Sequence, residues 1–150
     1  MSLEVEERGT DQLLRFLEGA PANIDKATEE GLDLLGEMAE QKAKEYAPVR
    51  TGALRESIHF IRRGFEILLS SRVFYAVFQE FGTRPHLIRP VRARALRWFA
   101  ETGEPIFAMS VRHPGTQPRL FITRALEEIR PLVLQVLRGK IEEWLRRRGE

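Results

Sequence analysis

Side chains that commonly carry out chemistry are sparse in this sequence and are poorly spaced for it. The three histidines, His59, His86 and His113, lie far apart, and none stands in a metal-binding spacing such as HExxH. The sequence has no cysteine, which excludes a thiol nucleophile, a cysteine-ligated metal and a disulfide scaffold. It also lacks a phosphate-binding loop, a GxGxxG fingerprint and a GxSxG elbow. We therefore predict no catalytic, cofactor-binding or metal-ligating residue.

Glu80 is the one carboxylate whose surroundings favour desolvation, because aromatic residues flank it in sequence. A desolvated carboxyl group can act as a general acid or base. No second acid stands at a spacing that marks a paired-carboxylate site. We therefore expect Glu80 to form an ion pair with an arginine such as Arg84, and we expect the protein not to be an enzyme.

Arginines near the middle of the chain are the strongest candidates for a binding function. The segment 84–100 contains no acid, and its candidate interface residues are Arg84, Arg89, Arg92, Arg94 and Arg97. Arginine pairs bidentately with phosphates and with carboxylates. With Trp98 beside them, these residues could bind nucleic acid, because aromatic rings stack on unpaired bases. They could equally contact another protein subunit or form an exposed basic loop.

Charge is distributed unevenly along the chain, although the formal net charge is only +2. Residues 1–47 hold twelve acidic and five basic residues, whereas residues 48–150 hold ten acidic and nineteen basic residues. Of the 24 basic residues, 20 are arginine. This asymmetry indicates either a polyanionic partner or copies of the chain packed acidic face to basic face, and composition does not choose between them.

Two apolar stripes at helical spacing flank the segments that must position these residues. The first runs from Ala22 to Ala47 and ends at Pro48. The second predicts a helix over roughly Thr123–Arg146, with a kink or restart at Pro131. The opposite face of the first stripe is acidic and supplies the second set of candidate interface residues, Glu29, Glu30, Asp33, Glu37 and Glu40.

Between the helices, β-rich runs predict an antiparallel sheet. Residues 57–62 and 65–70 flank an Arg63–Gly64 turn, and residues 73–81 form a third strand or a short helix. Residues 106–111 predict a further strand. The fold class is therefore α+β, with an antiparallel sheet packed against a long N-terminal helix and a C-terminal helix.

Length and pattern together predict one domain over residues 1–150. Within it, residues 1–21 form an N-terminal arm or short helix, and residues 83–105 form an extended basic loop or loose hairpin. The sequence has no apolar run of the roughly 18 residues that a membrane-spanning helix needs, and its acidic N-terminus is unlike a signal peptide.

Three motifs follow one another along the chain: AKEYAPVRTGALRESI at 43–58, YAVFQEFGT at 75–83 and HPGTQPRLFITRAL at 113–126. Together they resemble the tail-component family of tailed bacteriophages, in lambda-like and HK-type phages and their prophages. The resemblance extends from about residue 22 to 145, with departures at Arg50, where an acid is common, and at Leu120, where proline is common. Its fold-determining positions are Pro48, Thr51, Gly52, Leu54, Gly82, Thr83, Pro114, Gly115 and Phe121.

The resemblance implies a non-enzymatic virion structural protein of the head–tail junction, a neck or tail-completion component without a cofactor. It implies a ring, with six copies as the expected number, between the head connector and the tail tube, and a lumen through which DNA passes. The location would be the virion, after assembly in the bacterial host cytoplasm, without a membrane. The alternative is a nucleic-acid-binding module that uses the arginine cluster at 84–97 with Trp98.

Overall fold

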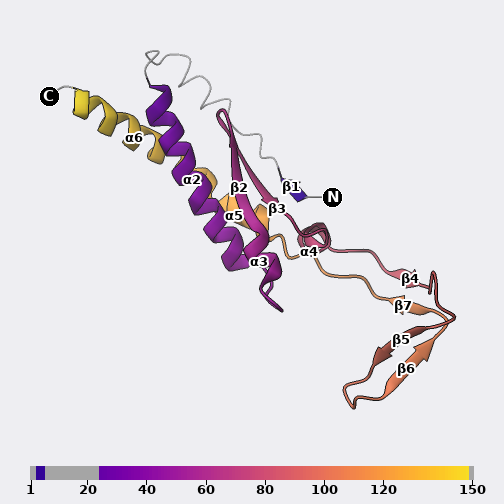
Figure 1. The fold of residues 1–150 in the computed structure, drawn as a ribbon. Coiled ribbons are helices and arrows are strands. Elements are labelled where there is room, and N and C mark those ends of the chain that lie inside the picture. Colours follow the sequence, from indigo (N-terminus) through magenta and orange to yellow (C-terminus); the bar gives the residue numbers. More distant parts are fainter. Residues whose placement is uncertain (1–2, 6–23, 149–150) are drawn as a thin grey trace.

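The computed structural model describes residues 3–5 and 24–148 (Figure 1). The predicted α+β fold class is confirmed, whereas the arm or short helix expected over 1–21 lies outside the described residues except for a three-residue strand. In chain order the elements are β1 (Leu3–Val5), α2 (Asp25–Tyr46), α3 (Ala53–Ser57), β2 (Ile58–Arg63), β3 (Glu66–Ser71), α4 (Ala76–Phe81), β4 (His86–Ile88), β5 (Leu96–Phe99), β6 (Pro105–Ala108), β7 (Val111–His113), α5 (Phe121–Ile129), the 3-10 turn η1 (Arg130–Leu132) and α6 (Val133–Arg148).

Helix α2 forms because its small and apolar residues recur every three or four positions and all enter the core. Its buried residues are Ala27, Thr28, Gly31, Leu32, Leu35, Gly36, Ala39 and Ala43. The helix begins at Asp25, where no side chain caps it, and ends before Ala47, which is extended ahead of Pro48. The predicted helix is thus confirmed, with a start three residues later than Ala22.

The core surrounds α2, which contacts β2 and β3 as well as α5 and α6. Leu35 of α2, Leu69 of β3, Phe121 and Ile122 of α5 and Leu137 of α6 are all fully buried there. Pro131 lies in η1, so the predicted restart between the two C-terminal helices is confirmed. This body of helices and one sheet is the platform from which the rest of the chain projects.

The two glycines inside α2 are sites of close packing. A Cβ at Gly31 would lie 2.7 Å from Leu137 Cδ2 of α6, and a Cβ at Gly36 would overlap the Phe60 ring of β2. The sequence indicated only that these glycines weaken helix propensity. The structure shows the compensation, because their missing side chains let α6 and β2 approach the α2 backbone.

The sheet of the body is antiparallel and has the strand order β1-β3-β2. Strands β2 and β3 pair from Ile58 opposite Ser71 to Arg63 opposite Glu66, so the predicted hairpin is confirmed, with its turn at Gly64–Phe65, one residue later than the predicted Arg63–Gly64. Strand β1 pairs with the other edge of β3, with Leu3 opposite Ser71.

Two parts of the predicted sheet differ in the structure. Residues 76–81 form helix α4, the second of the two alternatives for that run, and its buried residues Ala76 and Glu80 stand one helical turn apart. The prediction that 106–111 joins the sheet of 57–81 was wrong: β6 pairs with β5, and β7 pairs with β4. A short apolar run indicates a strand but not its partner. Here β5 and β6, which are neighbours along the chain, pair with each other, and β4 and β7 on either side of them form the second pair.

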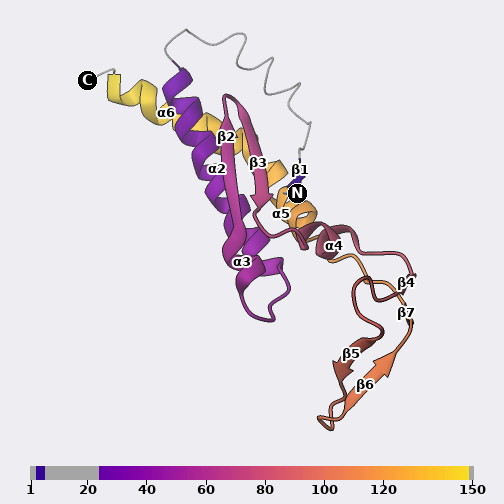
Figure 2. The same ribbon diagram turned by 45° about the vertical axis from the view of Figure 1, so that its right-hand side comes forward.

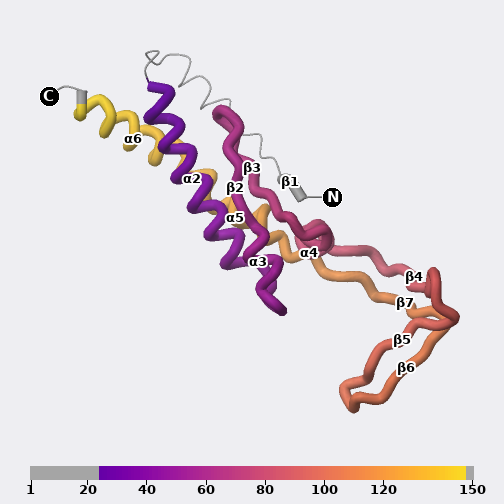
Figure 3. Tube along the Cα trace, viewed as in Figure 1, coloured from indigo at the N-terminus to yellow at the C-terminus, as the bar shows by residue number. Residues whose placement is uncertain are grey.

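Residues 83–118, which we call the arm, form two successive antiparallel ribbons. At the root Thr83 bridges Thr116; farther out β4 pairs with β7, and at the end β5 pairs with β6. The ribbons project away from the body in both ribbon views (Figures 1 and 2), and the Cα trace shows the two limbs running side by side (Figure 3). The basic segment 83–105 is therefore one limb and the tip of a two-limbed arm that returns to the body at residue 118.

Candidate assembly surfaces

Glu80 fixes the root of the arm to the body. The side chain is fully buried, and its Oε2 accepts a hydrogen bond from the Ile122 backbone N–H at 2.9 Å. Its Oε1 accepts bonds from the Thr123 backbone N–H at 2.9 Å and from the Thr123 hydroxyl at 2.7 Å. These N–H groups belong to the first turn of α5, where no intrahelical acceptor exists. The expected ion pair with Arg84 was therefore wrong, because the carboxylate caps α5.

Both limbs of the arm are held at the same place. The Thr83 N–H donates to Thr116 O at 2.9 Å, and the Thr116 N–H donates back to Thr83 O at 3.1 Å. Gly82 and Gly115 flank this bridge with φ angles of 71° and 90°, and a Cβ on either would overlap the backbone carbonyl oxygen across the bridge. Only glycine satisfies both conditions, which explains why these motif positions are glycines.

Leu120 stands where the family motif commonly has proline, and its backbone conformation differs accordingly. Its φ angle of 51° lies in the left-handed region, and its N–H donates to Glu80 O at 3.1 Å. Proline can supply neither this angle nor this donor. The chain in this protein thus enters α5 by a conformation that the commoner proline would not allow.

The remaining motif residues lie in turns and in the core. Pro48 follows the end of α2, and Gly52, with a φ angle of 87°, precedes α3. The Thr51 hydroxyl accepts a hydrogen bond from the Ala53 N–H at 3.4 Å, and Leu54 is buried. In the third motif, exposed Pro114 precedes the root of the returning limb, and Phe121 is fully buried at the start of α5.

The five candidate arginines are all exposed, but they are spread along the arm rather than gathered in one cluster. Arg84 lies at the root, and Arg97 lies on β5; the other three occupy the elbow between β4 and β5, at Arg89, Arg92 and Arg94. The Arg97 guanidinium carbon lies 5.0 Å from the Phe99 ring centroid and 6.0 Å from that of Phe107. Trp98 follows Arg97 on the strand and so faces the opposite side of the ribbon.

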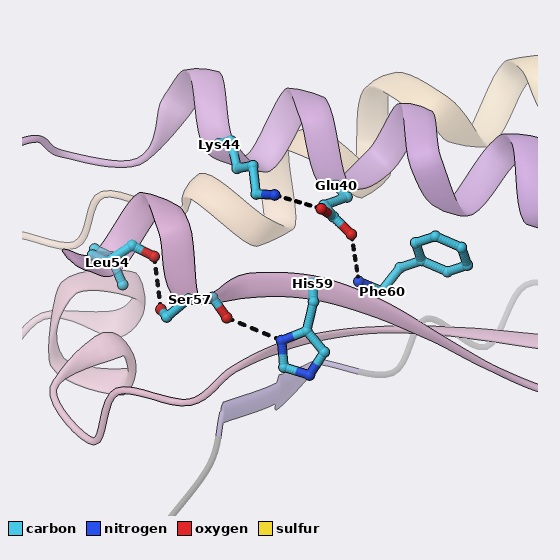
Figure 4. Close-up of polar contacts among 6 residues, drawn as sticks. All are labelled: Glu40, Lys44, Leu54, Ser57, His59 and Phe60. Carbon is cyan, nitrogen blue, oxygen red and sulfur yellow. Dashed lines mark hydrogen bonds and ion pairs between the residues drawn. The ribbon is translucent and has the colours of Figure 1, made fainter. Parts of the chain in front are cut away.

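Three of the five candidate acids on α2 already have partners within the chain. Arg62 of β2 pairs with Asp33 at 2.7 Å and with Glu29 at 3.6 Å. Glu40 accepts bonds from the Lys44 ammonium and, at 2.9 Å, from the Phe60 N–H (Figure 4). These acids tie α2 to β2. Within the part of the chain that the structure describes, no ion pair is formed by exposed Glu30 or Glu37, so these two remain for an outside partner.

The pKa of Glu40 reflects this position between α2 and β2. Burial by itself raises the pKa, but the hydrogen bonds from Lys44 and from the Phe60 N–H, together with the Lys44 charge, bring the pKa below its ordinary value. The Glu40 carboxylate is therefore ionised in the folded protein at neutral pH. Beside it, an open groove of mixed charge is lined by Glu37, Glu40, Gln41, Lys44, Glu45, Arg55 and Phe60.

Two exposed apolar surfaces were missed by reasoning from the sequence. The first, which we call the shoulder, consists of Phe74, Phe78 and Phe81, with exposed fractions of 68%, 47% and 55%. The second lies on the β5–β6 hairpin, with Phe99 and Phe107 exposed by 61% and 63%. The sequence indicated a strand or a short helix at the shoulder and strand residues in the hairpin, but not that either would be exposed. The spacing of four and three between the shoulder phenylalanines was the available signal for one exposed helical face.

Other kinds of site have no support in the described residues. Across residues 3–5 and 24–148, no group of three or more histidines and acids is placed to hold a metal ion. Among the helices of the same part of the chain, none has the length and apolar character required to cross a membrane.

A comparison with known families gives one match. Residues 11–82 match the family described as "Bacteriophage HK97-gp10, putative tail-component". The match covers just under half of the chain and includes the first motif and nearly all of the second; the third motif and the whole arm lie beyond it. Neither curated proteins nor solved structures gave a match. The resemblance to a phage tail-component family, predicted from the motifs, is thus confirmed.

Proposed function

We propose that this chain, whose residues 11–82 match a family of bacteriophage tail components, is a non-enzymatic structural protein of the head–tail junction. A match to such a family supports a virion structural protein. The protein is a neck or tail-completion component that forms a ring of six copies between the head connector and the tail tube, assembled in the host cytoplasm, with DNA passing through the lumen.

The observation that carries this proposal is the arm. It places arginines and large apolar side chains outside the core of the body, on a projection that extends away from the body's described helices and sheet (Figure 2). Exposed apolar surface of this kind marks an interaction site in a soluble protein. A projection that contacts a different surface of a neighbouring copy makes a heterologous interface, which closes into a ring when the rotation between copies allows it.

The charged part of this interface joins the elbow to the acidic helix. Arg89, Arg92 and Arg94 are exposed at the elbow, and Glu30 and Glu37 are the two of the five candidate acids on α2 that form no ion pair among the described residues. Opposite charges steer association and fix the orientation of the partners, and salt screens them beyond about 8 Å at physiological ionic strength.

Charge reversal tests this contact. We expect the variant R89E/R92E/R94E to lose self-association in sedimentation velocity while keeping its fold, since exposed substitutions usually cost within about 0.5 kcal/mol. Adding E30R/E37R restores association in part if the two surfaces meet. The matched control R50E/R138E/R146E makes the same change in charge on exposed residues of the body and should associate like the parent. Normal association of the elbow variant would contradict the proposal.

The position in the virion is tested in a phage or prophage that encodes the chain. Deleting the gene should yield full heads and separate tails in electron micrographs, and a copy supplied in trans should restore joined particles. Antibody against the protein should label the junction. Joined, infectious particles without the gene, or a label along the tail, would refute the head–tail position.

A nucleic-acid-binding module is the alternative, favoured by the contact of Arg97 with Phe99 and Phe107, which could stack on unpaired bases. Binding to phosphates weakens with salt, with a slope near 0.9 in log–log terms for each phosphate neutralised. If the elbow reversal assembles normally and loses only DNA affinity with such a slope, the alternative is correct.

A further inference from the structure

The β5–β6 hairpin has two apolar faces. Its register places Arg97 opposite Phe107 and Trp98 opposite Ile106, so the side chains of these pairs point to opposite sides of the ribbon. On one face Phe99 and Phe107 are exposed by 61% and 63%, and on the other Trp98 and Ile106 are exposed by 39% and 38%. An isolated two-stranded hairpin is marginally stable in water. Each face of this hairpin therefore needs a partner surface.

The arm keeps this hairpin away from its own body. The β4–β7 ribbon separates it from α4, and the hairpin projects outward in both ribbon views (Figures 1 and 2). Arg97 contacts Phe99 and Phe107, which belong to the hairpin itself. Among the described residues, the body therefore supplies no surface that covers this hairpin.

The shoulder is a second exposed apolar surface on the same chain. Phe78 and Phe81 are three residues apart in α4 and so lie on one side of the helix, and exposed Phe74 lies in the turn that leads into it. Exposed arginines border them in sequence or in space: Arg72 and Arg84 flank the segment, and the Arg119 N–H donates to Gln79 O at 2.9 Å. Glu80, the acid within α4, is buried in the α5 cap. The shoulder is thus apolar with a basic border.

The tip of the hairpin has the complementary character. Glu101 and Glu104 are exposed in the turn that joins β5 to β6, next to exposed Phe99 and at the start of β6. This face of the hairpin thus carries two exposed aromatic rings with Arg97 beside them, and the turn next to it is acidic. Opposite charge at the rim of two apolar surfaces favours one specific pairing and suppresses others.

We propose that the hairpin of residues 96–108 in one copy docks on the shoulder of a second copy, with Phe99 and Phe107 against Phe74, Phe78 and Phe81. Glu101 and Glu104 then face Arg72, Arg84 and Arg119 of the neighbour. The contact is heterologous, because each copy donates its hairpin and accepts another on its shoulder. It deepens the proposed function by naming the apolar part of the interface between copies.

Complementation between two variants tests this pairing. The hairpin variant F99S/F107S and the shoulder variant F78S/F81S each lose one half of the interface. Truncating aromatic residues at the centre of an interface weakens binding by about thirtyfold or more. In sedimentation velocity, each variant alone should be monomeric where the parent associates, and an equimolar mixture should form dimers, because one intact hairpin and one intact shoulder remain.

A control and a charge exchange complete the experiment. V49S/L145S removes two apolar residues of similar exposure from the body and should associate like the parent, while circular dichroism verifies the fold of every variant. E101R/E104R and R72E/R119E should each weaken association, and their mixture should recover it. A mixture of the two serine variants that stays monomeric, a hairpin variant that associates normally, or a parent that stays monomeric would each overturn the docking.

These outcomes are distinct from those of the proposed function. If gene deletion leaves heads and tails unjoined while both serine variants still associate and restore joined particles, the head–tail role stands and the docking is wrong. If complementation between the variants succeeds but deletion yields normal particles, the docking stands and the head–tail role is wrong.

Discussion

At the scale of single residues, Glu80 shows how one buried carboxylate can organise a junction between elements. It belongs to α4, yet its oxygens satisfy N–H donors of α5 that are 42 and 43 residues away in sequence. A buried donor left without an acceptor costs about 1–3 kcal/mol. The carboxylate therefore stabilises the start of α5 and the place where the arm leaves the body.

We expect E80Q to lower the free energy of unfolding by about 1–3 kcal/mol. The donors of Ile122 and Thr123 bond to both oxygens of the carboxylate, whereas the glutamine amide has only one acceptor oxygen. The measurement is the urea midpoint at constant m-value. E66Q, which changes an exposed glutamate at the start of β3, is the control and should leave the midpoint unchanged. Equal midpoints for E80Q and the parent would show that the cap contributes nothing.

Glu40 gives the second prediction at this scale, which concerns pH. Its folded-state pKa is below the ordinary value of 4.5, so the group contributes stability that is present above pH 4.5 and is lost as pH falls through the folded-state pKa. E40Q should remove this component, so its unfolding free energy should decrease less than that of the parent upon acidification below pH 4.5. E30Q, at an exposed acid of the same helix, should follow the parent. An unchanged acid slope in E40Q would contradict the linkage.

At the scale of elements, α2 is packed closely because of its glycines. Ala at position 36 would gain about 1 kcal/mol of helix propensity, but its Cβ overlaps the Phe60 ring. We expect G36A to destabilise the protein by about 1–3 kcal/mol, as overpacking does. G139A in α6 is the matched control, since nothing lies within 4 Å of its added Cβ, and it should be neutral or stabilising. Thermal unfolding measures the stability of both variants, and a change of the same sign in both would contradict the close packing at Gly36.

The sequence predicted the elements better than their partners. The spacing of Leu32, Leu35 and Ala39 was sufficient to place α2, since period is a local property. The strand at 106–111 was recognised, but its partner was wrong, because pairing depends on contacts that a short apolar run does not encode. For the same reason the partner of Glu80 was missed, as its cap lies 42 residues away. The exposure of the hairpin aromatics could not be predicted, because the residue type alone does not distinguish an exposed aromatic side chain from a buried one.

At the scale of the whole molecule, body and arm have separate roles, and the arm's outer part contributes no side chain to the core. Replacing residues 95–109 by a short Gly–Ser turn should therefore change the free energy of unfolding of the body by no more than about 0.5 kcal/mol, because its buried contacts are untouched. Self-association should be abolished by the same change. A clearly lowered thermal midpoint of the shortened protein would show that the arm also supports the body.

The root of the arm has a mechanical consequence. Its two limbs enter the body side by side and are tied there by the Thr83–Thr116 bridge, by the bond from the Arg119 N–H to Gln79 O and by the cap of Glu80. A pull on the tip is thus divided between two strands in parallel and passes directly into α4 and α5. Because both limbs are anchored at the root, we expect a force on the tip to rotate the arm about its root before it separates one limb from the body.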